Sequence, residues 1–147
     1  MPTILDPACR DQLLARIRRL EPDLKPQWGR MNASQMICHL GDQLRVALGE
    51  KPVRDISNFF SRGPLKALVL YAPLPTPKGK IQTADEMLDT QATTWDEDIA
   101  RLEKLVERFV ATDPGRTLHP MFGQLNHRQW GILAAKHMAH HLDQFGV

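Results

Sequence analysis

Hydrophobic residues recur at helical spacing in four stretches of the chain, separated by segments rich in proline or glycine. Apolar positions three or four residues apart form one face of an amphipathic helix. The first stretch opens with Asp6, a typical helix cap, followed by Pro7, and it ends near Pro22. We therefore predict a first helix of about four turns. Its buried face carries Leu13, Leu14, Ile17 and Leu20.

The second predicted helix runs from Asn32 to Gly49 and has a recognisable signal at each end. Asn32 can cap the first amides while Gln35, three positions later, reaches back to it, which makes a capping box. Gly49 is a typical helix stop. At about 100° of rotation per residue, His39 lies beside the buried stripe rather than at its centre. The stripe consists of Ile37, Leu40, Leu44, Ala47 and Leu48, with Met36 on its edge.

Two more long helices are predicted in the second half of the chain. One starts at Thr93 or Thr94 and stops at the Asp-Pro-Gly sequence of residues 113–115. Residues 116–125 then form a linker, and Asn126 caps the last helix. That helix has a broad apolar stripe made of Trp130, Leu133, Ala134, Met138, Leu142 and Phe145.

Between the second and third helices lies a long connection, residues 50–92, whose prolines prevent one continuous helix. Within it, residues 65–72 are apolar enough for a short helix, residues 73–83 are expected to be extended or turn-like, and residues 83–88 begin a brief helical turn. No stretch shows a convincing strand pattern. The pattern as a whole predicts an all-α four-helix bundle formed by one domain, residues 1–147.

Composition narrows the function classes. The 147 residues include 19 lysines and arginines against 17 acidic residues, for a net charge of +2. This balance disfavours nucleic acid and membrane surfaces as partners. Cys9 and Cys38 lie far apart in helix-like sequence, so no disulfide is inferred. No segment approaches the roughly 18 apolar residues of a membrane span. We expect a soluble, cytoplasmic protein.

The last helix carries a candidate metal site. His137 and His141 are four residues apart, so their imidazoles project from one helix face, within the sector of the apolar stripe. This spacing alone is a weak signal, and hydrogen-bonded interior histidines are the simpler alternative. A buried neutral imidazole needs a partner at each nitrogen, however, and one cation can serve both rings. His39 is the candidate third ligand.

Three histidines leave open coordination positions, as in many catalytic zinc sites. We expect second-shell or substrate contacts from Gln35 and Gln43 near His39, and from Gln144 near His141. Asp42 is a further candidate for such a contact near His39; the alternative, solvated helix surface, applies more to Asp42 than to Gln144. The other two histidines weighed as ligands, His119 in a loop and His127 in the first turn of the last helix, are weaker candidates.

These residues resemble a known family. His39 followed by His137-x3-His141 and Gln144 looks like the metal-binding histidine triad of the DinB-like superfamily of four-helix bundles. The stretches MNASQMICHLGDQLRVALG, PKGK, HPMFGQLNHRQWGILAAKH and HHLDQFGV are similar to a branch catalogued as a domain of unknown function. The resemblance implies a bundle, often dimeric, that binds a divalent metal, typically zinc or nickel, through His39, His137 and His141. Relatives include thiol-dependent S-transferases and isomerases that use mycothiol or glutathione.

Two functional hypotheses follow. The first is a metal-dependent enzyme, a thiol S-transferase or a hydrolase, acting on a small-molecule substrate or a low-molecular-weight thiol, with residues 50–92 over the pocket. In it, Tyr71, Lys78 or Lys80 contacts the substrate. The alternative is a non-catalytic, stress-associated binding or scaffold protein in which the histidines are structural. A homodimer is compatible with either hypothesis.

Overall fold

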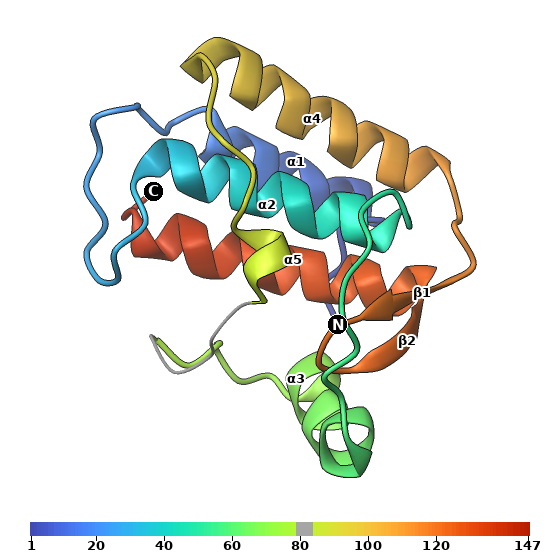
Figure 1. Ribbon diagram of the computed structural model, residues 1–147. Helices are drawn as coiled ribbons and strands as arrows, with labels where there is room; N and C mark the ends of the chain where they lie inside the picture. The colour runs from blue at the N-terminus through green and yellow to red at the C-terminus, as the bar shows by residue number, and fades with distance from the viewer. Residues whose placement is uncertain (79–83) are drawn as a thin grey trace.

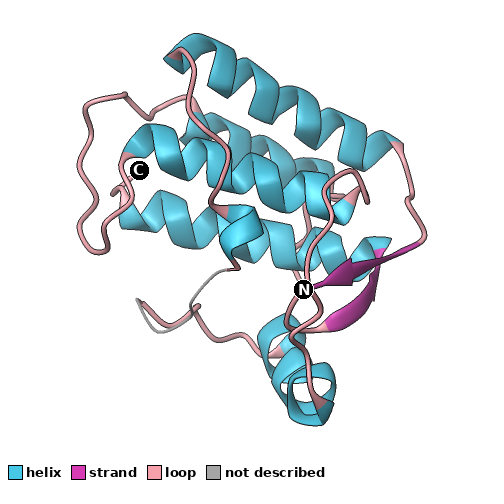
Figure 2. Cartoon of the chain, in the orientation of Figure 1, coloured by secondary structure: helices cyan, strands magenta, loops and turns pink. Residues whose placement is uncertain are grey.

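The computed structural model describes residues 1–78 and 84–147, and within them five α-helices and one β-hairpin surround a common core (Figures 1 and 2). The helices are α1 (Pro7–Ile17), α2 (Ala33–Ala47), α3 (Lys66–Tyr71), α4 (Trp95–Ala111) and α5 (His127–Gln144). A π-helical segment, η1 (Ser61–Leu65), leads into α3, and a 3-10 turn, η2 (Asp85–Met87), precedes α4. The antiparallel hairpin pairs β1 (Arg116–His119) with β2 (Gly123–Asn126), with Arg116 opposite Asn126.

Complete capping boxes fix the first residues of α2 and α5. The side chain of Asn32 accepts from the backbone N–H of Gln35 at 2.8 Å, and the side chain of Gln35 accepts from the backbone N–H of Asn32 at 2.9 Å. Asn126 and Gln129 repeat this arrangement at the start of α5. Both predicted helix starts are confirmed.

Helix α2 is the most deeply buried element. It packs against α4 on one side and α5 on the other, while α1 packs along α5 (Figure 1). Every residue from 36 to 44 is buried. A helix surrounded in this way places even its polar side chains in the interior, so His39, which sits off the apolar stripe, still faces another helix. Among the described residues, the largest fully buried side chains include Met36, Leu40, Leu44, Phe109, Trp130 and Met138.

The predicted all-α four-helix bundle is wrong, because the structure is mixed. It adds α3 and a two-stranded antiparallel sheet to the four long helices. The hairpin occupies residues that were expected to be a linker. Its strands have four residues each, too few for an alternating pattern to stand out. Contacts with distant segments hold it in place: Thr117 donates to the carbonyl of Ala47 at 2.7 Å, and Pro120 accepts from the backbone N–H of Ile56 at 2.9 Å.

The first helix is shorter than predicted. It ends at Ile17 rather than near Pro22, and the backbone N–H of Leu20 bonds to the carbonyl of Ile17 at 3.1 Å in a tight turn. Leu20 nevertheless remains in the core, 5% exposed. The apolar spacing therefore continued past the helix, because a turn buries the same side chain that another helical turn would bury.

The long connection is partly as expected. The predicted short helix is present as α3, and the predicted helical turn is present as η2. The expectation of extended chain for residues 73–83, and the suggested role for Lys80, fall partly or wholly on residues 79–83, which lie outside the described residues. Within residues 1–78 and 84–147, each helix is too short or too polar to serve as a transmembrane span.

Candidate metal centre

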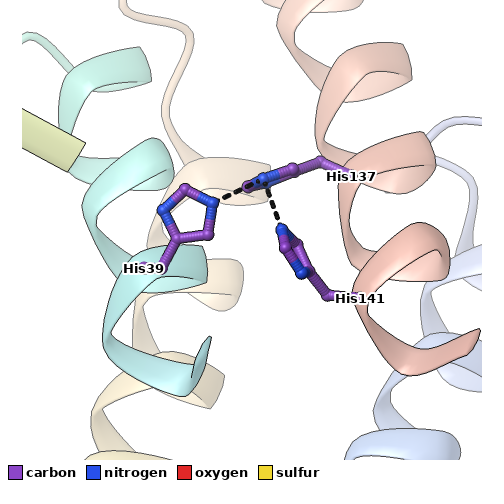
Figure 3. A group of neighbouring side chains, drawn as sticks. All are labelled: His39, His137 and His141. Carbon is purple, nitrogen blue, oxygen red and sulfur yellow. Dashed lines mark hydrogen bonds between the residues drawn. The ribbon is translucent and has the colours of Figure 1, made fainter. Parts of the chain in front are cut away.

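Three histidines from two helices converge on one point. His39 projects from α2, and His137 and His141 project from α5 toward it (Figure 3). Nε2 of His137 lies 2.8 Å from Nε2 of His39 and 3.1 Å from Nε2 of His141. The helix spacing brings the α5 pair together, and the packing of α2 on α5 adds the third ring.

The outer nitrogens of two rings are held by fixed acceptors. Nδ1 of His39 donates to the backbone carbonyl of Met87 at 2.8 Å. Nδ1 of His141 donates to Oε1 of Gln144 at 2.7 Å. The orientation of the Gln144 amide is itself determined, because its Nε2 donates to the carbonyl of Trp28 at 2.7 Å. A carbonyl oxygen can only accept, so both rings carry their proton on Nδ1 and leave Nε2 as a lone pair.

The third ring follows the same pattern. Nδ1 of His137 lies 2.9 Å from Oε1 of Gln43, and with its proton on Nδ1 the ring donates to this oxygen. The three Nε2 atoms therefore present lone pairs to one another at contact distance, with no proton between them. Such an arrangement is unfavourable unless a positive charge lies among the three nitrogens. Histidine ligands whose other nitrogen donates to a carbonyl oxygen are the usual arrangement around bound metals.

Protonation is a poor source of that charge. Burial lowers the pKa of His39, and burial with the neighbouring histidines holds the pKa of His137 well below its usual value. Burial also lowers the pKa of His141 to about 4. The three rings are therefore neutral near pH 7, the state in which they can bind a metal ion.

The spacing of the nitrogens fits a single ion. With metal–nitrogen bonds of about 2.1 Å, two ligand nitrogens on one ion lie about 3.0 Å apart in octahedral geometry and about 3.4 Å apart in tetrahedral geometry. The two observed separations are 2.8 and 3.1 Å, and all three ligand atoms lie within 4.8 Å of one another. Three buried or half-buried imidazoles with fixed tautomers can thus hold a divalent cation.

A cavity of about 300 Å³ adjoins the cluster. His39 and His141 are 2% and 7% exposed, and His137 is half-buried. Both His137 and His141 line the cavity. Among the described residues that line the cavity, the cationic side chains are Arg30 and Lys136, and none is acidic. Most of the wall is apolar and includes Ile56, Val69, Met87, Met121, Phe122 and Leu133.

One wall of the cavity is tied to the metal-binding helix by Lys136, the residue before His137. Its Nζ donates to the carbonyls of Val69 and Ala72 at 2.6 and 2.8 Å. These carbonyls lie at the end of α3, where backbone acceptors lack partners inside the helix. Burial lowers the pKa of the Lys136 ammonium. The segment around α3, residues 61–72, is thereby fixed beside the histidine cluster.

The three glutamines singled out in the sequence have different positions. Gln43 and Gln144 lie at the cluster and bond directly to His137 and His141. Gln35 is exposed, and its side chain is used in the capping box of α2. The alternative of solvated surface for Asp42 is excluded. It is 1% exposed, and its carboxylate accepts from Thr90 at 2.6 Å and pairs with Lys51 at 3.2 Å.

Of the suggested substrate contacts, Tyr71 and Lys78 are not among the residues that line the cavity. Tyr71 is 52% exposed, and its hydroxyl accepts from Gln129 at 3.3 Å, outside the wall of the cavity. Lys78 lies over the ring of Trp28, with Nζ 4.2 Å from the ring centre. His127 donates from Nε2 to the carbonyl of Phe109 at 2.7 Å, a contact within the core.

Three contributors to the site were missed in the sequence. The carbonyls of Met87 and Trp28 are backbone groups in connecting segments, and no side-chain pattern marks them. His119 was weighed only as a weak ligand candidate. It lies in the wall of the same cavity as His137 and His141, next to the hairpin turn. The one available signal was the His-Pro sequence, which is typical of a turn.

Comparison with known proteins assigns a family but no activity. The chain belongs to the family described as "Protein of unknown function (DUF1569)", whose model matches residues 5–146. Neither the curated proteins nor the solved structures gave a match. The predicted membership of the DinB-like superfamily is wrong, because the match is to DUF1569, a distinct family. The expected match to a domain of unknown function is confirmed. The activities implied by the DinB-like resemblance therefore have no support from this assignment.

Proposed function

We propose that this DUF1569 protein is a metal-dependent enzyme that binds one divalent ion through the Nε2 atoms of His39, His137 and His141. One observation carries the proposal: three Nε2 lone pairs meet at 2.8 and 3.1 Å while each Nδ1 proton is held by a carbonyl oxygen. Zinc or nickel suits a site made of imidazole nitrogens.

The chain itself supplies a partly enclosed site. Gln43, Gln144 and the Met87 carbonyl hold the three rings in orientation, and two of these rings, those of His137 and His141, line the cavity. Three protein ligands leave at least one coordination position free. A divalent ion held there supplies Lewis acidity and lowers the pKa of a bound water or thiol. The apolar wall limits the number of water molecules that compete with a substrate.

Hydrolysis is the reaction class that we propose. The thiol S-transferase hypothesis rested on a resemblance that the family assignment replaces, and it requires a second substrate. Water requires no further binding site. The cavity, about 300 Å³, is at the lower end of the range for small-molecule sites. Its wall is mainly apolar, with Arg30 and Lys136 and without a carboxylate among its described residues, which favours a neutral or anionic substrate over a cation.

Metal analysis tests the binding step. The full chain is purified without a histidine tag, its metal content is measured by elemental analysis, and zinc affinity is measured by competition with a chelating dye. We expect close to one ion per chain, and its loss in His137→Ala. His127→Ala is the matched control, because His127 bonds to the Phe109 carbonyl away from the cluster, and it should keep the ion. A native protein that contains no stoichiometric metal and binds none would contradict the proposal.

Chelation tests the catalytic step. Small apolar esters and amides are incubated with protein before and after treatment with a chelator, while circular dichroism follows the fold. Turnover that disappears with the metal and returns with zinc, in a chain that stays folded throughout, supports a catalytic site. A protein that binds the ion but unfolds on its removal, without turnover of any substrate, would favour the non-catalytic alternative.

A further inference from the structure

His119 and His140 also line the cavity, and hydrogen bonds fix the ring of His119. Its Nδ1 accepts two backbone N–H groups, from Met121 at 3.1 Å and from Phe122 at 3.2 Å. An N–H group can only donate, so Nδ1 is unprotonated and the ring proton is on Nε2. This is the opposite tautomer to that of the three clustered histidines.

The ring of His119 is held in place on several sides. It stacks on Phe122 with ring centres 4.6 Å apart and planes 16° apart, and its centre lies 5.2 Å from that of Trp130. Burial lowers the pKa of His119 to about 3. Protonation would also put an N–H group on Nδ1, where it would face the two backbone N–H groups that Nδ1 now accepts. The imidazole is therefore neutral throughout the physiological range of pH.

Its Nε2–H group has no hydrogen-bond partner within residues 1–78 and 84–147. In this part of the chain, the buried polar side-chain atoms that lack a partner belong to Asp42, Glu86 and Trp130. Nε2 of His119 is not among them, and His119 lines the cavity. A fixed donor of this kind is positioned to bind a ligand oxygen.

We propose that His119 binds the substrate by donating a hydrogen bond from Nε2 to a carbonyl or carboxylate oxygen of a mainly apolar molecule in the cavity. This inference rests on the proposed function, because it assigns the cavity beside the histidine cluster as the substrate site. A neutral N–H group can donate to either a neutral or an anionic oxygen. An ammonium group has no acceptor to offer, and the wall contains no carboxylate among its described residues to receive it.

The tautomer is tested on the unaltered protein. Long-range proton–nitrogen NMR spectra distinguish protonated from unprotonated ring nitrogens and follow each histidine with pH. We expect His119 to be protonated at Nε2 alone and to show no titration between pH 5 and pH 8. A proton on Nδ1, or titration near the ordinary histidine pKa of about 6.5, would overturn the proposal.

Ligand recognition is tested with benzamide, benzoate and benzylamine, which share an apolar ring and differ in the polar group. We expect benzamide or benzoate to bind and to shift the His119 Nε2–H resonance, and the two acceptors to show whether a neutral or an anionic oxygen is preferred. Benzylamine should bind more weakly than the better acceptor. Equal binding of all three, or no binding by any of them, would contradict the assigned specificity.

His119→Asn separates the donor from the turn that the ring supports. The Asn side-chain oxygen can accept the same backbone N–H groups, as it does in many turns, but the side chain is too short to replace Nε2. We expect benzamide to bind about 2- to 12-fold more weakly, the loss of one neutral hydrogen bond, with zinc affinity unchanged. His127→Asn, outside the cavity, should bind benzamide as the parent does. Unchanged binding by His119→Asn would overturn the proposal.

These measurements are made on both the metal-free and the zinc-loaded chain. If the protein binds no metal, the metal-dependent function fails, while the tautomer of His119 and the binding of benzamide can still be read on the metal-free chain. If the protein binds zinc and His119→Asn binds the probes as the parent does, only the role of His119 fails.

Discussion

Gln144 accepts the Nδ1 proton of His141 at 2.7 Å, less than one helical turn further along α5. The same side-chain amide donates from Nε2 to the backbone carbonyl of Trp28. The backbone carbonyl of Gln144 accepts from the backbone N–H of Gln27 at 2.8 Å. The loop that contains residues 27 and 28 can approach Gln144 this closely because the next residue is Gly29, with a φ of +80°. A Cβ at this position would lie 2.5 Å from the Gln144 side chain. One residue thus connects a loop near the first helix to the orientation of a metal-site histidine.

Replacing either buried glutamine should weaken metal binding. Gln144→Leu and Gln43→Leu keep much of the side-chain volume but remove the acceptor for Nδ1 of His141 or His137. Loss of such an outer contact typically costs about 10- to 100-fold in metal affinity, because the ring loses its fixed orientation and tautomer. Zinc affinity, measured against a chelating dye, reports the effect. Parental affinity in both variants would show that these glutamines do not orient the ligands.

Gln35→Ala should separate helix capping from metal binding. Gln35 bonds to the backbone N–H of Asn32 and not to the histidine cluster, although the sequence placed it near His39. We expect unchanged zinc affinity and a free energy of unfolding lower by about 1 kcal/mol, from the loss of half a capping box. Urea denaturation measures the second quantity. A fall in zinc affinity comparable with that of Gln43→Leu would place Gln35 in the site after all.

The sequence predicted those parts of the site that depend on helical geometry. The spacing of His137 and His141 determines their common face, and capping boxes mark the starts of the helices that carry the cluster, so the proximity of His39 could be anticipated from helix packing. The outer contacts are a different matter. Met87 and Trp28 contribute backbone carbonyls, which every residue has, and only the path of the connecting segments brings these two to the histidines.

The hairpin was missed for a related reason. Strands of four residues contain too few alternations to be distinguished from a loop, and contacts with Ala47 and Ile56, far away in sequence, hold the hairpin in place. The fixed tautomer of His119 depends on this same turn, because Met121 and Phe122 provide its two donors. A histidine before a proline could therefore not be recognised as a neutral donor until the turn was known.

The metal-free protein should lose stability as the pH falls from about 6.5. Burial lowers the pKa of His119 to about 3 in the folded chain, against about 6.5 in the unfolded chain. Between these values the unfolded state binds the additional proton, so the free energy of unfolding rises with pH by about 1.4 kcal/mol per pH unit for this residue, and the effect ends above about pH 6.5. Urea denaturation of the parent and of His119→Asn at pH 5 and pH 7, with a chelator present, measures it. The variant should show the smaller difference; an equal difference in the two proteins would contradict the assignment.

Lys136→Met should loosen α3 without affecting the metal ligands. The variant keeps an apolar stem of similar length but loses the two donors that bind the carbonyls of Val69 and Ala72 at 2.6 and 2.8 Å. Hydrogen bonds from a charged group contribute about 1.5–3 kcal/mol each, so we expect the amides of α3 to exchange with solvent at least about tenfold faster. Hydrogen exchange measures this, and Lys104→Met on the exposed face of α4 is the matched control. Because the ammonium contacts α3 and not the Nε2 atoms, zinc affinity should stay at the parental value. Unchanged exchange in α3 would mean that packing, and not Lys136, holds this wall of the cavity in place.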